Sequence, residues 1–233
     1  MDELTEREIN KIDEFYVKNS FALKMLETEI DILLKSYAYK NKNNPVEHIK
    51  TRLKTQESAI KKLKNKGYKI TAHNLLKHVH DIIGIRIVCS FLSDVYDVVD
   101  LIKKSDQFEI KEEKDYITNP KKTGYMSYHI IIVVPIYLND KVEYVDAEIQ
   151  VRTIAMDFWA SLDHKLQYKI TGIADEISEE IYNCAVDIKA LDEKMNNLNK
   201  KVSKYKKALE KESKWFFFCR INSSFVELLE KIF

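Results

Sequence analysis

Residues 142–152, VEYVDAEIQVR, alternate between apolar and polar side chains, and this alternation predicts a β-strand. Successive side chains of a strand point to opposite faces. One face carries a mostly apolar set suited to a core: Glu143, Val145, Ala147, Ile149 and Val151. The other face carries a polar set: Tyr144, Asp146, Glu148, Gln150 and Arg152. The polar face is either a solvated sheet surface or the floor of a polar pocket.

Strand-like runs before this segment predict a sheet, and periodic segments around them predict helices. The β-rich runs are residues 82–89 (IIGIRIVC), 108–114 and 128–134, with a turn at 138–140 before the strand 142–152. Helical spacing covers residues 93–104, with Ser93 as the N-cap, and returns at Ile154. The expected fold class is therefore α+β, a mixed β-sheet flanked by helices.

Helical extensions are expected on both sides of this centre. Residues 1–40 have the spacing of two helices broken at Asn19–Ser20, and a breaker at 41–45 precedes a helix over 46–65 that stops at Gly67. A short helix is expected at 72–79, and C-terminal helices at 176–211 and 224–232. The expected division is N-terminal helices at 1–45, a core at 46–170 and a C-terminal helical extension at 171–233.

Composition excludes some classes of protein. The chain has 233 residues, and its 38 Lys and Arg nearly cancel its 37 Asp and Glu, so bulk charge does not indicate a polyanionic partner. The first ten residues are acidic and polar, unlike a secretory signal, and no apolar run is long enough to span a membrane. Three widely spaced cysteines, Cys89, Cys184 and Cys219, indicate reduced thiols in a cytoplasmic protein.

Asp81 precedes the run IIGIRIVC and Arg86 lies within it, and both are candidates for chemistry. A half-buried arginine in an apolar strand is costly unless it is paired, so we expect Arg86 to meet an acid or a ligand. Strict alternation places Asp81 and Arg86 on opposite faces of the strand. The two residues can share a site if Asp81 precedes the strand, or if Gly84 hosts a β-bulge.

Two basic segments carry candidate phosphate ligands. In residues 116–129 (YITNPKKTGYMSYH), Lys121 and Lys122 could neutralise phosphates, and Tyr125 after a flexible glycine could stack on a base. In the expected helix 46–65, one face would carry a row suited to a polyphosphate: Lys54, Ser58 and Lys61 or Lys62. Each segment is also consistent with a solvated basic surface.

Two common motifs are incomplete or absent. His78, His80 and Asp81 are similar to the His-Asp pair of metal-dependent phosphohydrolases. That chemistry needs further ligands from several helices, whereas this pair leads directly into a strand. No GxxxxGK[ST] sequence occurs, which excludes a P-loop ATP site.

Four segments, in this order, resemble the synthetase domain of the RelA/SpoT family, and specifically its small single-domain alarmone synthetases. They are RLKTQESAIKKL at 52–63, HDIIGIRIVC at 80–89, KDYITNPKKTGYMSYH at 114–129 and EIQVRTIAMDFWASLDHKLQYK at 148–169. The resemblance implies a nucleotidyltransferase-like fold and a GTP pyrophosphokinase. In this reaction ATP donates its β,γ-pyrophosphate to the ribose 3′-hydroxyl of GDP or GTP, which yields (p)ppGpp and AMP.

The resemblance also implies roles for particular residues. Asp81 and Glu148 would bind Mg²⁺, and Glu148 would help to deprotonate the attacking hydroxyl. At ATP, Arg52 and Arg86 would enclose the adenine, and the phosphate contacts would be Lys54, Ser58 and Lys62. Tyr125 would stack on guanine, and the acceptor side would be lined by Lys114, Lys121, His129, Gln150, Arg152 and Asp157. By the same analogy the chain would form a homo-oligomer, as a tetramer, with a possible allosteric nucleotide or regulatory RNA and no membrane partner.

The chain departs from the family pattern at two positions. Ile83 replaces a small residue, which should affect packing only, and Met126 stands where related motifs carry arginine, which leaves the choice among GMP, GDP and GTP open. Two other functions also stay open. One is a toxic relative that modifies the 3′ end of tRNA or an adenine nucleotide, and the other is an inactive RNA-binding regulatory module.

Overall fold

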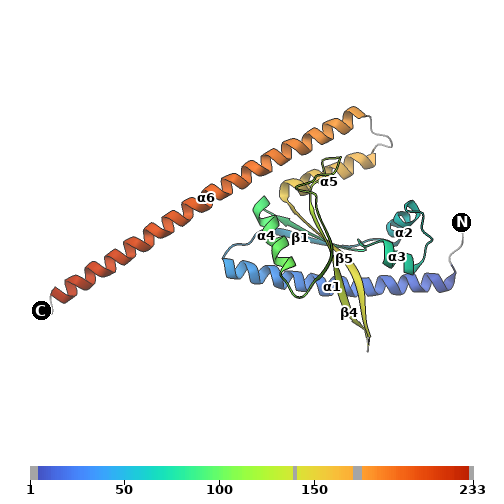
Figure 1. Ribbon diagram of the computed structural model, residues 1–233, viewed down its shortest axis with the longest axis horizontal. Coiled ribbons are helices and arrows are strands. Elements are labelled where there is room, and N and C mark those ends of the chain that lie inside the picture. Colours follow the sequence, from blue (N-terminus) through green and yellow to red (C-terminus); the bar gives the residue numbers. More distant parts are fainter. Residues whose placement is uncertain (1–4, 139–140, 170–174, 231–233) are drawn as a thin grey trace. The chain divides into compact units, whose positions relative to one another are not determined.

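Five strands form one mixed sheet in the order β1-β2-β5-β4-β3 (Figure 1). The strands are β1 (Val46–Leu53), β2 (Ile83–Cys89), β3 (Glu109–Asp115), β4 (Tyr128–Leu138) and β5 (Lys141–Thr153). The central β2–β5 pair is parallel, and each other neighbouring pair is antiparallel. The structure is a computed structural model that describes residues 5–138, 141–169 and 175–230, without the side chains of 167–169, 175 and 211–230. The expected α+β class is confirmed.

The helices are α1 (Glu6–Asn41), α2 (Gln56–Asn65), α3 (Ala72–His78), α4 (Leu92–Lys103), α5 (Ile154–Lys169) and α6 (Asp175–Glu230). The chain forms two compact units, Met1–Asp192 and Glu193–Phe233, and each is described by itself. The first unit contains the sheet, α1 to α5 and the start of α6, and the second continues α6. Among the described residues, no helix is long and apolar enough to cross a membrane.

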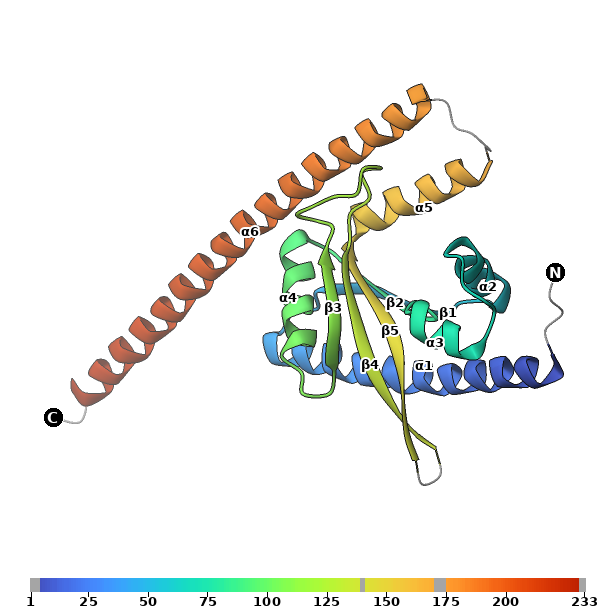
Figure 2. The ribbon, with the colours of Figure 1, turned by 45° about the vertical axis from the view of Figure 1, so that its right-hand side comes forward.

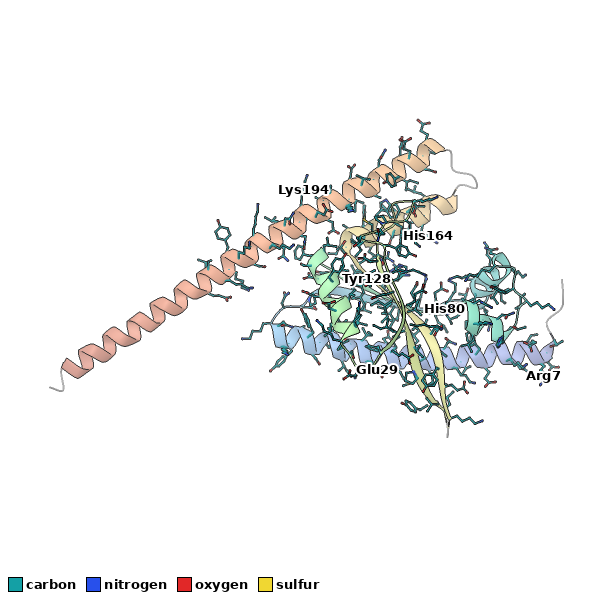
Figure 3. All side chains as sticks on the ribbon, in the orientation of Figure 1. Arg7, Glu29, His80, Tyr128, His164 and Lys194 are labelled. Atoms are coloured by element: carbon teal, nitrogen blue, oxygen red, sulfur yellow. The ribbon has the colours of Figure 1, made fainter. Side chains whose placement is uncertain are left out.

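The apolar face of the sheet is covered by α1 and α4 (Figure 2). Leu26 and Ile30 of α1 and Val98 of α4 are buried in one cluster with strand residues such as Ile85 and Ile149. A second cluster joins the start of α1 to α2 and α3, and its buried members are Ile12, Ala59, Leu63, Leu75, Val79 and Ile82. Figure 3 shows the side chains crowded around the strands and the helices that cover them. The polar face of β5 points away from the large cluster.

The expected break at Asn19–Ser20 is wrong, because α1 is continuous from Glu6 to Asn41. The two polar side chains bond within the helix instead of capping it. Asn19 Nδ2 donates to the Phe15 carbonyl at 2.8 Å, and Ser20 Oγ donates to the Val17 carbonyl at 2.7 Å. The amide of Asn19 is buried without cost because this partner satisfies it.

The expected helix over 46–65 is also wrong in its first half, where residues 46–53 form the edge strand β1. Pairing with β2 overrides the helical spacing in this segment. The burial of these residues alternates as expected for a strand. Ile49 and Leu53 are half-buried, whereas Lys50 and Arg52 are exposed. Helix α2 begins only at Gln56, where Thr55 Oγ1 accepts a hydrogen bond from the Ser58 N–H at 3.3 Å.

The boundaries of the other helices and strands differ less from those expected. Helix α4 begins at Leu92 with Phe91 as N-cap, so Ser93 lies within its first turn and is not the cap. The strand expected at 128–134 continues through Pro135 to Leu138, and the two expected C-terminal helices are one helix, α6. Of the expected turn at 138–140, residues 139–140 lie outside the described residues, as do 231–233. Cys89 and Cys184 are free thiols, and the side chain of Cys219 lies outside the described part.

Helix α1 should be essential to the stability of the sheet, because Leu26 is fully buried against it. We expect Leu26→Ala to lower the free energy of unfolding by about 2–5 kcal/mol, measured by urea denaturation. Ile32→Ala is the matched control, since Ile32 lies on the same helix with 57% of its side chain exposed. Equal destabilisation by the two substitutions would contradict the packing of α1 described here.

Candidate active site

Two neighbouring rows of side chains cross the sheet on the face opposite α1 and α4. The strand registers align the first row as Arg52, Gly84, Glu148, Ile131 and Glu112. The second row is Lys50, Arg86, Gln150, His129 and Lys114. The polar face of the strand 142–152 is therefore joined by polar side chains from all four other strands. A cavity of about 380 Å³ lies over these rows.

Asp81 lies two residues before β2 begins, so it reaches the same face as Arg86. The pairing of β2 is regular through Gly84, and no bulge is needed there. Of the two arrangements considered for Asp81, the one in which it precedes the strand is confirmed. Gly84 has another function, since a Cβ atom there would lie 3.1 Å from Arg52 Nε and 3.2 Å from Arg52 Cγ. The glycine lets the Arg52 side chain lie across β2.

The Asp81 carboxylate is held by two lysines from different elements. Lys54 Nζ, just after β1, donates to Oδ2 at 2.9 Å, and Lys62 Nζ of α2 donates to Oδ1 at 2.8 Å. Burial acts to raise the pKa of Asp81, but the bonds from Lys62 and Lys54 outweigh it and lower the pKa to about 2. Asp81 is therefore ionised at neutral pH and already surrounded by positive charge.

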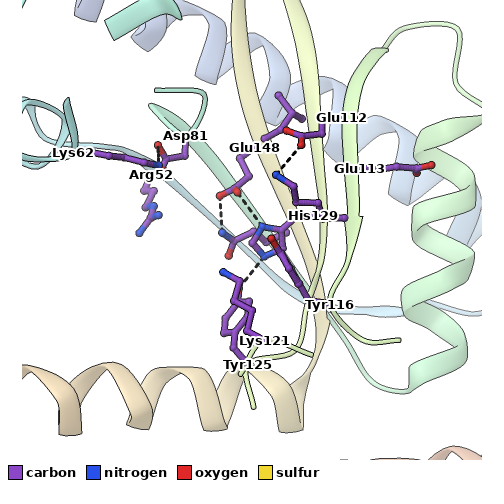
Figure 4. Close-up of a pocket in the computed structure, with 13 residues that line it drawn as sticks. Arg52, Lys62, Asp81, Glu112, Glu113, Tyr116, Lys121, Tyr125, His129 and Glu148 are labelled. Carbon is purple, nitrogen blue, oxygen red and sulfur yellow. Dashed lines mark hydrogen bonds and ion pairs between the residues drawn. The ribbon is translucent and has the colours of Figure 1, made fainter. Parts of the chain in front are cut away.

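Glu148 is the acceptor at the end of a directed chain of hydrogen bonds (Figure 4). Arg152 donates to the Tyr125 hydroxyl at 3.1 Å, and this hydroxyl lies 2.9 Å from His129 Nε2. His129 Nδ1 lies 3.0 Å from Glu148 Oε1. Because an ionised carboxylate can only accept, His129 Nδ1 is the donor in its hydrogen bond to Glu148.

A second donor completes the support of Glu148, because Gln150 Nε2 donates to Oε2 at 2.7 Å. Arg152 fixes that amide in turn by donating to Gln150 Oε1 at 2.5 Å. Burial acts to raise the pKa of Glu148, but the hydrogen bonds and charge of its partners, His129 first, lower it overall. The nearby Asp81 charge acts in the opposite direction. Two ionised carboxylates thus face one cavity, Glu148 from β5 and Asp81 from the connection just before the neighbouring parallel strand β2.

The loop between β3 and β4 supplies the aromatic wall of the cavity. Asp115 fixes the start of the loop by accepting hydrogen bonds from the backbone N–H groups of Ile117 and Thr118 at 2.8 and 2.9 Å. The Tyr116 and Tyr125 rings both meet the His129 ring edge-to-face. Lys121 Nζ lies 4.6 Å from the Tyr116 ring centroid and 4.7 Å from the Tyr125 centroid.

Gly124 allows this loop to fold back toward α6. Its φ is 88°, a conformation that side chains disfavour, and a Cβ atom there would lie 2.5 Å from the Ala185 Cβ. A hydrogen bond from the Gly124 N–H to the Lys121 carbonyl at 2.8 Å closes the turn. The position therefore needs glycine for two independent reasons.

A second cavity, of about 310 Å³, lies between Arg52 and Arg86 and is also lined by Lys50, Gly84 and Gln150. Asp157 of α5 supports this wall, with Oδ1 at 3.1 Å from an Arg86 guanidinium nitrogen and at 3.6 Å from one of Arg152. Arg86 therefore meets an acid, as expected. The Nε atoms of Arg86 and Arg152 are buried without a hydrogen-bond partner among the described residues.

The structure brings together most of the residues singled out in the sequence. Those that line the first cavity are Arg52, Lys62, Asp81, Lys114, Lys121, Tyr125, His129, Glu148 and Gln150. Arg86 lines the second cavity, and Lys54, Arg152 and Asp157 contact residues of the two walls. Ser58 is exposed on α2, lines neither cavity and accepts a hydrogen bond from Thr55 at 3.0 Å. The expected helical row of lysines is wrong, because Lys54 precedes α2, although Lys54 and Lys62 still converge on Asp81.

Several lining residues were not anticipated, namely Glu112, Glu113, Tyr116 and Ile131 in the first cavity and Lys50 in the second. Lys114 of β3 was expected at the site, but Glu112 was not, and a β-bulge shifts the register of β3 between Ile110 and Glu112. Met126 does not line the first cavity, since it is 3% exposed and packs in the large hydrophobic cluster. Ile83 packs there as well, as expected.

The two carboxylates fit one kind of metal site. No group of three or more His, Cys, Asp or Glu side chains that could hold a metal occurs among the described residues. Asp81 and Glu148 alone would therefore offer two carboxylates on the wall of an open cavity. Mg²⁺ commonly binds through one or two carboxylates and completes its octahedron with water and phosphate oxygens. The donor set fits Mg²⁺ that arrives with a nucleotide, and it does not fit a cage built from protein ligands.

Comparison with known proteins finds relatives over most of the chain. Residues 51–173 match the region found in RelA / SpoT proteins. The GTP pyrophosphokinase YwaC of Bacillus subtilis is 46% identical over 183 residues, 78% of this chain and 87% of its own. The solved small alarmone synthetase 2 of B. subtilis is 45% identical with a TM-score of 0.72, covering 81% of this chain and 97% of that one. Small alarmone synthetase 1 of B. subtilis, solved with its product pppGpp, is 28% identical with a TM-score of 0.75 over 83% and 99%.

The two lysines on Asp81 should control its ionisation. We expect the double substitution Lys54→Met and Lys62→Met to raise the pKa of Asp81 above its ordinary value, because burial is then unopposed. Carbon-13 NMR titration of the carboxyl group measures this. In the wild type the low pKa stabilises the fold above about pH 4, and this stabilisation is lost as pH falls toward 2. An unchanged Asp81 titration in the double variant would contradict the assignment.

Proposed function

This chain belongs to the RelA/SpoT family, and on that basis we propose that it is a GTP pyrophosphokinase that makes (p)ppGpp. The reaction moves the β,γ-pyrophosphate of ATP to the 3′-hydroxyl of GDP or GTP and releases AMP. The observation that carries the proposal is the pair of ionised carboxylates, Asp81 and Glu148, in a cavity also lined by cations and tyrosines. The relatives YwaC and YjbM carry the same activity in their names.

The ATP side of the proposed site is built around the two arginines. Arg52 and Arg86 border the second cavity, where planar guanidinium groups can stack on a purine. The triphosphate then extends toward Asp81, which would bring it to Lys54 and Lys62. These lysines are held by Asp81 in the absence of a nucleotide, and the phosphate oxygens would compete for them. Ser58 at the start of α2 is proposed to meet the same phosphates.

Asp81 and Glu148 would hold Mg²⁺ together with the ATP phosphates. The metal ion, when bound, neutralises charge on the transferred group and on the leaving group. The chain prepares this site by keeping both acids ionised at neutral pH. Pyrophosphoryl transfer depends mainly on positioning and charge neutralisation, so a weakly basic carboxylate is sufficient near the attacking hydroxyl. Glu148 is proposed to accept the hydrogen bond of the 3′-hydroxyl and, in the transfer, its proton.

The acceptor side is proposed to lie against the loop between β3 and β4. Tyr125 offers its ring to guanine, and its hydroxyl is tied to His129 and Arg152, so the ring cannot turn freely. Lys121 covers the ring at present and would move to the acceptor phosphates. Lys114, which pairs with Glu112 at 2.7 Å, is the other cation of this wall. Gln150, Arg152 and Asp157 fix the floor beneath the ribose.

We further propose that residues 46–170 form the catalytic core, flanked by helical extensions at 1–45 and 171–233. The proposed substrates, ATP and GDP or GTP, imply a cytoplasmic enzyme. Assembly as a homo-oligomer, with four subunits as the simplest expectation, and control by a nucleotide or RNA follow by analogy with the family. Size-exclusion chromatography with light scattering measures the number of subunits in the assembly.

Replacing Glu148 tests the chemistry directly. We expect Glu148→Gln to reduce AMP production from ATP and GDP at least about 100-fold, because one metal ligand and the hydroxyl acceptor are lost. The matched control is Glu143→Gln on the same strand, which faces Lys18 at 2.7 Å and lies outside the cavity. Circular dichroism should show both variants folded, and full activity of Glu148→Gln would refute the assigned role.

The acceptor can be identified by offering several candidates separately. Radiolabelled ATP is incubated with GMP, GDP, GTP, ATP or tRNA, and the products are separated by chromatography. We expect label on guanine nucleotides at their 3′ position. Label that appears only on tRNA or on an adenine nucleotide would establish the toxic type of activity instead. No transfer to any acceptor would favour an inactive binding module.

A further inference from the structure

We propose that Asp146 is a positioning residue that holds Asp81 in register with Glu148 through His80. This inference rests on the proposed function of Asp81 and Glu148 as the metal-binding pair. Asp146 lies two residues before Glu148 on the same face of β5. Its carboxyl group lines neither of the two cavities described above, so it would act through another residue and not on the substrate.

Three side chains form what we call the Asp146 clamp: Lys111, Asp146 and His80. The Asp146 Oδ2 atom lies 2.5 Å from His80 Nδ1 and 2.8 Å from Lys111 Nζ. The Asp146 side chain is only 12% exposed, so its contacts are poorly screened by solvent. A buried carboxylate is retained at such a position only when it is well paired, and both partners here come from other elements.

The bulge in β3 is what allows Lys111 to join the clamp. Ile110 pairs with Ile132 and Glu112 pairs with Ile131, so Lys111 is the extra residue of β3. A bulge turns two successive side chains toward one face, which here is the face of Asp146. Without the bulge, Glu112 and Lys111 would point to opposite faces. The bulge therefore directs the ammonium group of Lys111 across β4 toward Asp146.

The other end of the clamp is the short connection between α3 and β2. His80 lies in this connection (Figure 3), and Asp81 is the next residue. The connection is also held by the buried side chains of Val79 and Ile82, and the Lys54 N–H donates to the Ile82 carbonyl at 2.8 Å. These contacts fix the segment against α2 and β1. The Asp146–His80 contact ties it to β5, the strand that carries Glu148.

Metal binding by two carboxylates depends on the distance between them, because Mg²⁺ accepts little departure from its octahedral geometry. Asp81 lies in the α3–β2 connection and Glu148 lies in β5, so their separation depends on how this connection sits beside β5. Partners that orient metal ligands commonly change metal affinity or activity 10–100-fold when they are removed. Asp146 is in the position to have this effect.

The decisive measurement is metal binding, independent of turnover. Mn²⁺, which substitutes for Mg²⁺ and is detected by electron paramagnetic resonance, is titrated into each protein in the presence of the ATP analogue AMPCPP. We expect Asp146→Asn to weaken Mn²⁺ binding about 10-fold or more. Glu143→Gln, which removes an acid on the same strand paired to Lys18, should leave the Mn²⁺ affinity unchanged. Wild-type Mn²⁺ affinity in a folded Asp146→Asn protein would overturn the proposal.

A double substitution tests whether the effect passes through His80. His80→Asn and Asp146→Asn remove opposite ends of one contact, so the double variant should bind Mn²⁺ no more weakly than the worse single variant. Additive losses would overturn the link. If Asp146→Asn does not fold, Lys111→Met replaces it, and an unchanged Mn²⁺ affinity there would count against the clamp. Failure of the wild type to make AMP from ATP and GDP would refute the proposed function. The comparison of Mn²⁺ affinities tests the Asp146 clamp independently of that result.

Discussion

The parallel pairing of β2 with β5 sets where the two acids of this protein meet. Gly84 aligns with Glu148, and Ile83 aligns with Ala147, so the residues just before β2 lie beside the middle of β5. Asp81 is carried to that place by the backbone and not by a long side chain. A shift of one residue in this register would turn Glu148 into the hydrophobic core, because strand faces alternate. The apolar residues of β5, packed under α1 and α4, therefore fix the site as firmly as they fix the fold.

Ion pairs and hydrogen bonds from the chain hold both acids of the site. Asp81 accepts hydrogen bonds from Lys54 and Lys62. Glu148 is paired with His129 and Gln150. Under the proposed function, a metal nucleotide would exchange partners with these pairs, since its cation suits the carboxylates and its phosphates suit the lysines. This exchange would reduce the cost of separating each pair, because both of its charged groups gain a new partner.

The fold class and much of the site could be predicted from the sequence, for identifiable reasons. The strand 142–152 has an unambiguous period of two, and Arg86 in an apolar strand correctly predicted an acidic partner, which is Asp157. Failures occurred where tertiary contacts decide the outcome. Residues 46–53 become a strand because β2 offers an edge, and Asn19 stays within a helix because a carbonyl satisfies its amide. Lys114 of β3 was correctly expected at the site, whereas the placement of Lys111 and Glu112 depends on a bulge, which no period in the sequence reveals.

The close approach of Gly124 to Ala185 also determines how α6 can lie against the loop. The two positions leave room for a single methyl group between them. Sliding the helix by one turn in either direction would bring Ile181 or Lys189 to this point, and neither side chain could be accommodated. The close contact therefore fixes the position of the start of α6 along the helix axis, relative to the loop. Enlargement of Ala185 should therefore displace the loop that carries Tyr125.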